Sequence, residues 1–215
     1  MLSKDRFESK IVSQRKEGTL EQSLHFVTIP NYISILRILL VPVFVAAVGY
    51  YVDREEEVYR YFAITIFAIA ALSDALDGFL ARYLNQMSRL GAILDPLADK
   101  LLLVSGIVVL SMDHRPILPS IPIWLTTLII SRDAILPLGT ILISYTGIRP
   151  KVQPKLLGKL ATVSQMTMIS WALLKAPELG LKFLIILTGI LTLGSGIQYI
   201  HDGVSQLEEK PAETS

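Results

Sequence analysis

The chain of 215 residues contains no cysteine, which excludes disulfide bonds and thiolate metal sites. Charged residues make up only 18% of it, whereas soluble domains carry about 25%. Its histidines are scattered and form no plausible metal-binding set (His25, His114 and His201). The first 28 residues lack the short apolar core of a cleavable signal peptide, and no internal repeat is visible. These absences exclude secreted disulfide scaffolds and zinc-finger-type sites.

Long apolar runs are present instead. A helix needs about 20 apolar residues to cross the hydrocarbon core of a bilayer, and backbone groups in lipid must be satisfied within the segment. We therefore predict an all-α integral membrane protein with six transmembrane helices. The expected spans are roughly 32–51, 58–79, 92–112, 122–145, 157–175 and 180–200.

The distribution of lysine and arginine predicts the orientation of these spans. The tail at 1–28 carries Lys4, Arg6, Lys10, Arg15 and Lys16, whereas the connection "DREEEV" after the first span is net acidic. Basic residues return after the second span and after the fourth (Arg82 and Arg89; Arg149, Lys151, Lys155 and Lys159). Both termini are therefore expected in the cytosol. The predicted parts are an N-terminal tail at 1–28, a six-helix catalytic domain at 29–203 and a C-terminal tail at 204–215.

Four aspartates lie within 26 residues, in the stretch "SDALDGFLARYLNQMSRLGAILDPLADK" at 73–100. Asp74 and Asp77 are three residues apart and share a helix face, which Gly78 and Ala81 continue with almost no side chain. The second pair, four residues apart, also shares a face, with a glycine one turn earlier (Asp95, Asp99 and Gly91). If the two helices pack through these faces, four carboxylates converge at the cytosolic end.

Four close carboxylates repel one another, so they are either partly protonated or neutralised by cations. All-oxygen ligands suit hard ions such as Mg²⁺, Mn²⁺ or Ca²⁺, and two metals about 4 Å apart are usual in phosphoryl chemistry. The alternative is that Asp74 and Asp77 are solvated residues at a helix end and that Asp99 pairs with Lys100. Four acids interleaved with small residues favour the metal site.

The pattern D-x2-D-G-x2-A-R-x8-G-x3-D-x3-D resembles the signature of the CDP-alcohol phosphotransferase family. It is matched without departure by Asp74, Asp77, Gly78, Ala81, Arg82, Gly91, Asp95 and Asp99. The resemblance implies an enzyme that transfers the phosphate-bearing half of a CDP-linked donor to an alcohol and releases CMP. It implies that the four aspartates bind two divalent metal ions, Mg²⁺ or Mn²⁺, and that Asp99 is the catalytic base. Gly78, Ala81, Arg82 and Gly91 would form the pocket for the CDP moiety.

Two segments suggest the donor and the acceptor. Residues 28–45, "TIPNYISILRILLVPVFV", resemble the opening of bacterial phosphatidylglycerophosphate synthases and of the related cardiolipin synthases in this family. The donor would then be CDP-diacylglycerol, and the acceptor glycerol 3-phosphate or, alternatively, phosphatidylglycerol. The run "LLGKLATVSQM" at 156–166 favours glycerol 3-phosphate, because it resembles a segment of the phosphatidylglycerophosphate synthases.

Basic residues are the candidates for an acceptor phosphate. Lys159 lies one turn into a predicted helix, and Arg149 lies in the basic connection before it, where anchoring to anionic lipids is the alternative role. Arg132 and Asp133 lie within the fourth span, where charges are costly unless paired. Neighbours on a helix point about 100° apart, so each is expected to meet another helix. They could form a structural ion pair, or Arg132 could bind the acceptor; the sequence leaves both roles open. The tripeptide "SRD" at 131–133 resembles the cardiolipin synthases more closely than the phosphatidylglycerophosphate synthases.

A cation transporter is the alternative from another functional class, but its path needs polar groups through the depth of the membrane. We expect a bacterial inner-membrane location, contact with membrane lipids and no nucleic-acid partner. Gly189, Gly194 and Gly196 suit close helix packing, and a homodimer face is predicted there.

Overall fold

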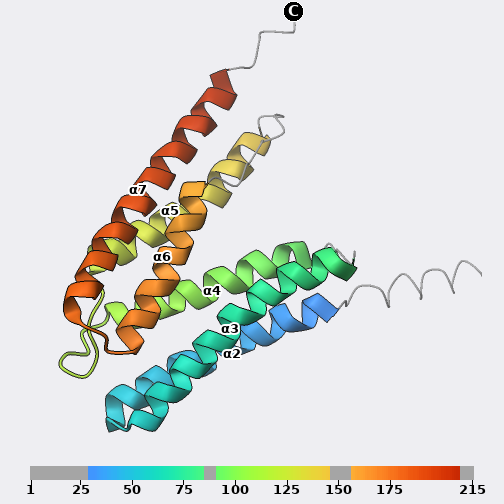
Figure 1. Ribbon diagram of the computed structural model, residues 1–215. Coiled ribbons are helices and arrows are strands. Elements are labelled where there is room, and N and C mark those ends of the chain that lie inside the picture. Colours follow the sequence, from blue (N-terminus) through green and yellow to red (C-terminus); the bar gives the residue numbers. More distant parts are fainter. Residues whose placement is uncertain (1–28, 85–90, 146–155, 209–215) are drawn as a thin grey trace, which may run out of the picture. The chain divides into compact units, whose positions relative to one another are not determined.

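The computed structural model describes residues 29–84, 91–145 and 156–208, and six α-helices contain most of these residues (Figure 1). They are α2 (Ile29–Arg54), α3 (Glu57–Leu84), α4 (Gly91–Ser111), α5 (Ile123–Tyr145), α6 (Leu156–Leu173) and α7 (Glu178–Glu208). Each overlaps one predicted span, so the all-α prediction is confirmed for the described part of the chain. The predicted N-terminal tail at 1–28 lies outside the described residues, and α7 extends into the predicted C-terminal tail.

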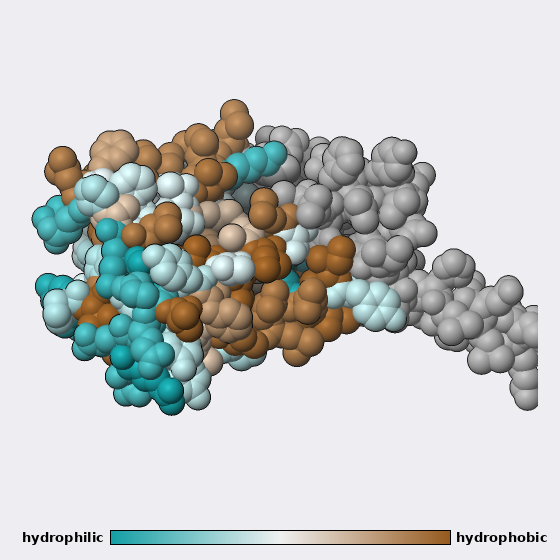
Figure 2. Space-filling model, turned by 60° about the horizontal axis from the view of Figure 1, so that its bottom comes forward, coloured by the Kyte–Doolittle hydropathy of each residue, from teal (hydrophilic) through white to brown (hydrophobic). Residues whose placement is uncertain are grey.

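Three helical segments in the described part of the chain are long and apolar enough to cross a membrane by length and composition: Tyr32–Arg54, Ile123–Leu142 and Glu178–Ser205. Large apolar side chains lie on the outside of the helices, and Figure 2 shows them in brown over much of the described surface on one face. On α7 they form a stripe at helical spacing (Leu179, Phe183, Ile186, Ile190, Leu193 and Ile197). An exposed apolar stripe of this length is typical of a surface that faces lipid.

The chain forms two compact units, and three helices contribute to both. The described part of the first unit contains 29–43 of α2, 66–84 of α3 and 91–102 of α4. Ala70 and Ala98 are completely buried in it. Small buried residues allow helix backbones in a membrane to approach closely.

The second unit contains α5, α6 and α7, together with 44–65 and 103–111 from the other helices. Helix α7 packs against both α5 and α6, as Figure 1 shows in red, yellow and orange. The Ser164 and Thr188 hydroxyls form a buried hydrogen bond of 2.6 Å between α6 and α7. Such a bond satisfies two polar groups that would be costly in an apolar interior.

The glycines of α7 accommodate side chains of the same chain. A Cβ added at Gly189 would lie 3.2 Å from the Trp124 ring, and Gly194 and Gly196 face Leu157 and Arg132. The prediction of close helix packing is therefore confirmed at Gly189, whereas an added Cβ at Gly194 or Gly196 would make ordinary van der Waals contacts of 3.9 Å and 3.7 Å. The homodimer face stays a prediction.

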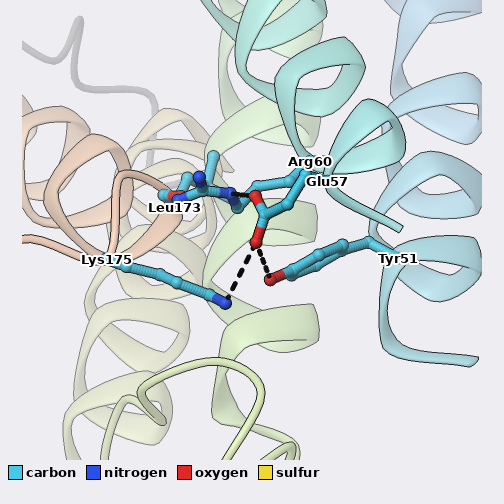
Figure 3. Close-up of polar contacts among 5 residues, drawn as sticks. All are labelled: Tyr51, Glu57, Arg60, Leu173 and Lys175. Carbon is cyan, nitrogen blue, oxygen red and sulfur yellow. Dashed lines mark hydrogen bonds and ion pairs between the residues drawn. The ribbon is translucent and has the colours of Figure 1, made fainter. Parts of the chain in front are cut away.

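A polar cluster joins the α2–α3 connection to the turn between α6 and α7 (Figure 3). The Glu57 carboxylate accepts hydrogen bonds from the Arg60 guanidinium and, at 3.2 Å, from the Tyr51 hydroxyl. Lys175 approaches the same carboxylate to 3.5 Å, and Arg60 also donates to the Leu173 carbonyl at 3.5 Å. One carboxylate therefore ties the ends of α2 and α3 to the end of α6.

The cluster also changes the acidity of Glu57. Desolvation acts to raise the pKa of its carboxyl, but the hydrogen bond and charge of Arg60, the charge of Lys175 and the bond from Tyr51 outweigh it. The pKa of Glu57 consequently lies below its ordinary value of 4.5. The stabilisation that this implies is present above pH 4.5 and is lost as the pH falls through the lower pKa of the folded state.

Glu57→Gln should therefore unfold at a lower temperature than the wild type at neutral pH, and the difference should shrink below pH 4.5. The midpoint can be followed by tryptophan fluorescence in detergent. Glu178→Gln is the matched control, because its pair with Lys182 at 3.5 Å is highly exposed and should contribute less. A difference between wild type and Glu57→Gln that did not depend on pH would contradict the assignment.

Candidate active site

The described acids of the candidate site lie on the first turns of α4. Asp95 and Asp99 are four residues apart and are both partly buried. Because residues at this spacing lie one above the other on a helix, both carboxylates project from the same face. The Asp99 side chain is 30% exposed, so it remains accessible to a ligand.

Helix α2 supplies a partner for each of these carboxylates. The Ser34 hydroxyl donates a hydrogen bond to Asp95 Oδ1, and Arg37 Nη1 donates to Asp99 Oδ1 and forms an ion pair with it. Ser34 is completely buried and Arg37 is 1% exposed. Spacings of three residues on α2 and four on α4 bring both pairs into register.

Sequence reasoning did not identify Ser34 or Arg37 as site residues. The signal was nevertheless present in "ISILRILLVP" at 33–42, where one arginine interrupts an apolar run. An ionised side chain in such a run requires a partner inside the protein. The sequence alone does not say which of several distant acids that partner is.

The other members of the predicted site lie on the helices where they were expected. Asp74, Asp77, Gly78, Ala81 and Arg82 belong to α3, and Gly91 is the first residue of α4. All of these positions lie in the first unit, with Asp95 and Asp99. Their side chains lie outside the described part of the structure, so the convergence of four carboxylates stays a prediction.

Arg132 occupies a buried position in the second unit, where it connects α5 with α7. Its Nε donates to the Ser195 hydroxyl at 3.0 Å, and its guanidinium lies 5.9 Å from the centre of the Tyr199 ring. The prediction that Arg132 meets another helix is confirmed. Its Nη1 also donates to Asp133 at 2.8 Å, and both side chains are only 7% exposed. Sequence reasoning placed the neighbours about 100° apart, but the long arginine side chain reaches back to the carboxylate.

The first turn of α6 lies beside this guanidinium. A Cβ added at Gly158 would lie 3.0 Å from Arg132 Nη2. Lys159 follows in the sequence and is exposed. Arg149, the third predicted contact for an acceptor phosphate, lies outside the described residues.

Polar side chains without a partner among the described residues are buried in the same unit. Gln165 is 1% exposed, and neither atom of its amide has a hydrogen-bond partner within that part of the chain. The buried hydroxyls of Thr126 and Thr192 also have no hydrogen-bond partner among the described residues. Buried groups of this kind are unusual in proteins and often mark places where water or a polar ligand binds.

Comparison with known proteins agrees with the pattern of acids and glycines. The family model described as CDP-alcohol phosphatidyltransferase matches residues 27–194, a range that includes Ser34, Arg37, all four aspartates and Arg132. The chain belongs to the CDP-alcohol phosphatidyltransferase family. The family resemblance seen in the sequence is thus confirmed, as is the prediction that the protein is a phosphatidyltransferase.

Two bacterial relatives match most of this phosphatidyltransferase. A protein of Haemophilus influenzae is 33% identical over 178 residues, which cover 80% of this chain and 91% of the relative. A protein of Escherichia coli is 32% identical over 180 residues, covering 80% of this chain and 92% of the relative. Both are named CDP-diacylglycerol–glycerol-3-phosphate 3-phosphatidyltransferase. Membership of this family favours an enzyme over a cation transporter.

The contact at Gly158 makes a prediction about stability. Nε and Nη1 of Arg132 are both held, so its planar guanidinium cannot turn away from an added methyl group without lengthening those bonds. Gly139 on the same helix as Arg132 has nothing within 4 Å of an added Cβ. Gly139→Ala should raise the free energy of unfolding by up to about 1 kcal/mol, because alanine has a higher helix propensity than glycine. Gly158→Ala should have a free energy of unfolding about 1–3 kcal/mol lower than that of Gly139→Ala, because the added methyl group overpacks against Arg132.

Thermal unfolding of both alanine variants in detergent measures this difference. Equal stability of Gly158→Ala and Gly139→Ala would mean that the Arg132 guanidinium is free to move.

Proposed function

We propose that this enzyme transfers the phosphatidyl group of CDP-diacylglycerol to glycerol 3-phosphate, giving phosphatidylglycerophosphate and CMP. The observation that carries this proposal is the match to two relatives named for that reaction, over more than nine-tenths of their length. The eight positions of the family pattern, from Asp74 to Asp99, support the same chemistry.

The donor set fits divalent metal ions. Asp95 and Asp99 offer carboxylate oxygens, the ligands that Mg²⁺ and Mn²⁺ prefer, from consecutive turns of one helix. Asp74 and Asp77 would complete the set from α3, which suffices for two ions. When bound, the ions stabilise negative charge on the diphosphate of the donor.

The residues of the chain perform the remaining work. Asp99 accepts the proton of the acceptor hydroxyl, whose oxygen forms a bond to the phosphatidyl phosphorus. The bond from that phosphorus to the bridging oxygen breaks, and CMP leaves with the electron pair. Gly78, Ala81 and Gly91 allow close approach of the nucleotide to the backbone, and Arg82 binds it with its fork of donors.

An acceptor phosphate is dianionic and needs cations. Arg132 and Lys159 are the described candidates, and Arg149 is the third. The buried guanidinium of Arg132, with the first turn of α6 beside its Nη2, supports a phosphate contact there. Asp133 beside it favours the second candidate function, a cardiolipin synthase that uses phosphatidylglycerol, because a carboxylate repels a dianionic phosphate more strongly than the monoanionic phosphodiester of phosphatidylglycerol.

We place the enzyme in the bacterial inner membrane, with six spans, both termini in the cytosol and the acids at the cytosolic face. The basic connections support this orientation. The Glu57 cluster supports the alternation of six spans, because contact between the α2–α3 connection and the α6–α7 turn requires both on the same side (Figure 3). An alternating six-span topology puts them there.

The four acids should not be equivalent. Asp74→Asn should weaken metal binding, and excess Mn²⁺ should restore part of the activity, because an amide is a poorer ligand than a carboxylate. Asp99→Asn should lose about 10²–10⁴-fold in rate without recovery by metal, because the base is missing. CMP release from CDP-diacylglycerol in detergent measures both. Near-normal turnover by Asp99→Asn would refute the assignment of the base.

The acceptor is tested by the same assay with glycerol 3-phosphate and phosphatidylglycerol side by side. Lys159→Ala should raise KM for glycerol 3-phosphate about 10- to 100-fold, since a hydrogen bond to a charged group contributes about 1.5–3 kcal/mol. KM for CDP-diacylglycerol should change little. Lys182→Ala, which removes an exposed lysine on α7, is the control. Turnover with phosphatidylglycerol alone would establish the cardiolipin synthase.

A further inference from the structure

Helix α2 contacts both described aspartates of the candidate site. Ser34 donates to Asp95, and Arg37, one turn later, donates to Asp99. Both donors are buried almost completely, whereas both acceptors are only partly buried. The donors therefore hold the carboxylates from buried positions, while Asp99 keeps 30% of its side chain exposed.

These contacts are costly to build, which argues for a purpose beyond packing. Taking an ion such as the guanidinium of Arg37, which is 1% exposed, out of water costs several kcal/mol, and an apolar residue of similar volume is often as stable. Ser34 likewise occupies a completely buried position that an alanine could fill. A chain that needed only helix packing here would have no use for either donor.

Carboxylates that bind metal ions are commonly held by hydrogen bonds from neighbouring groups, which fix their orientation. We propose that Ser34 and Arg37 are positioning residues, which hold Asp95 and Asp99 in the orientation that binds divalent cations. This inference rests on the proposed function, because it requires that the two aspartates are metal ligands. It adds α2 to the two helices that carry the family pattern.

The two donors act differently, and this allows charge to be separated from orientation. Ser34→Ala removes a neutral donor and leaves every charge in place. Arg37→Lys keeps the positive charge but replaces a rigid fork with a single flexible ammonium. If orientation matters, both variants should bind metal more weakly. If Arg37 serves only to balance charge, Arg37→Lys should bind metal as the wild type does.

The test is Mn²⁺ binding to full-length protein in detergent, without substrate, measured from the free Mn²⁺ signal in electron paramagnetic resonance. Ser34→Ala and Arg37→Lys should each raise Kd about 10- to 100-fold. Ser34→Thr keeps the hydroxyl and should bind close to wild type. Arg54→Lys is the matched control on the same helix, because Arg54 lies against Tyr50 and Tyr59 in the second unit.

Each outcome decides the proposal. Unchanged Mn²⁺ affinity in Ser34→Ala and Arg37→Lys, with a lower unfolding temperature, would assign a merely structural role and overturn it. If Arg37→Lys does not fold, Ser34→Ala against Ser34→Thr decides alone. Absence of Mn²⁺ binding by the wild type would overturn the metal-dependent function as well, so the two failures are distinguishable.

Discussion

The cost of an unpaired charge in an apolar environment governs where the charged side chains of this protein lie. Arg37 pairs with Asp99, and Arg132 pairs with Asp133; in both pairs the arginine is more than nine-tenths buried. Charged residues at the helix ends are more exposed to solvent and depend less on a partner. Glu57 is an example, because it is half exposed and lies 3.5 Å from Lys175. Removing one partner from a buried pair leaves the other uncompensated, so these pairs constrain the helices that carry them.

The two buried pairs differ in what they connect. Arg132 and Asp133 are neighbours on α5, and it is the remaining donor of the arginine, to Ser195, that reaches α7. Arg37 and Asp99 join α2 to α4 directly. In the first arrangement the charge of the guanidinium is already compensated by its neighbour on the same helix. The second joins a cation to an acid of the candidate site.

Helices and the acidic pattern could be predicted from the sequence because both depend on local spacing. A run of about 20 apolar residues defines a span whatever its neighbours are. Asp95 and Asp99 share a face because of the helical repeat alone. Ser34 could not be assigned in this way, since its partner is 61 residues away and its hydroxyl is unremarkable in an apolar helix. The contact between Gly158 and Arg132 likewise depends on how α6 approaches α5.

The pairing of Arg37 with Asp99 also bears on how the chain enters the membrane. The two residues are 62 positions apart, so α2 is synthesised well before its acidic partner exists. An arginine at the centre of a helix raises the free energy of membrane insertion by about 2.5–3.5 kcal/mol, whereas each apolar residue around it lowers this free energy by only a few tenths of a kcal/mol. Arg37 lies in the third turn of α2, close to the start of the helix. Before α4 has been synthesised, its long side chain can therefore extend to the headgroup region of the membrane. Completion of α4 supplies the carboxylate with which the guanidinium pairs, so α2 reaches its final contacts only after the chain has been made as far as Asp99.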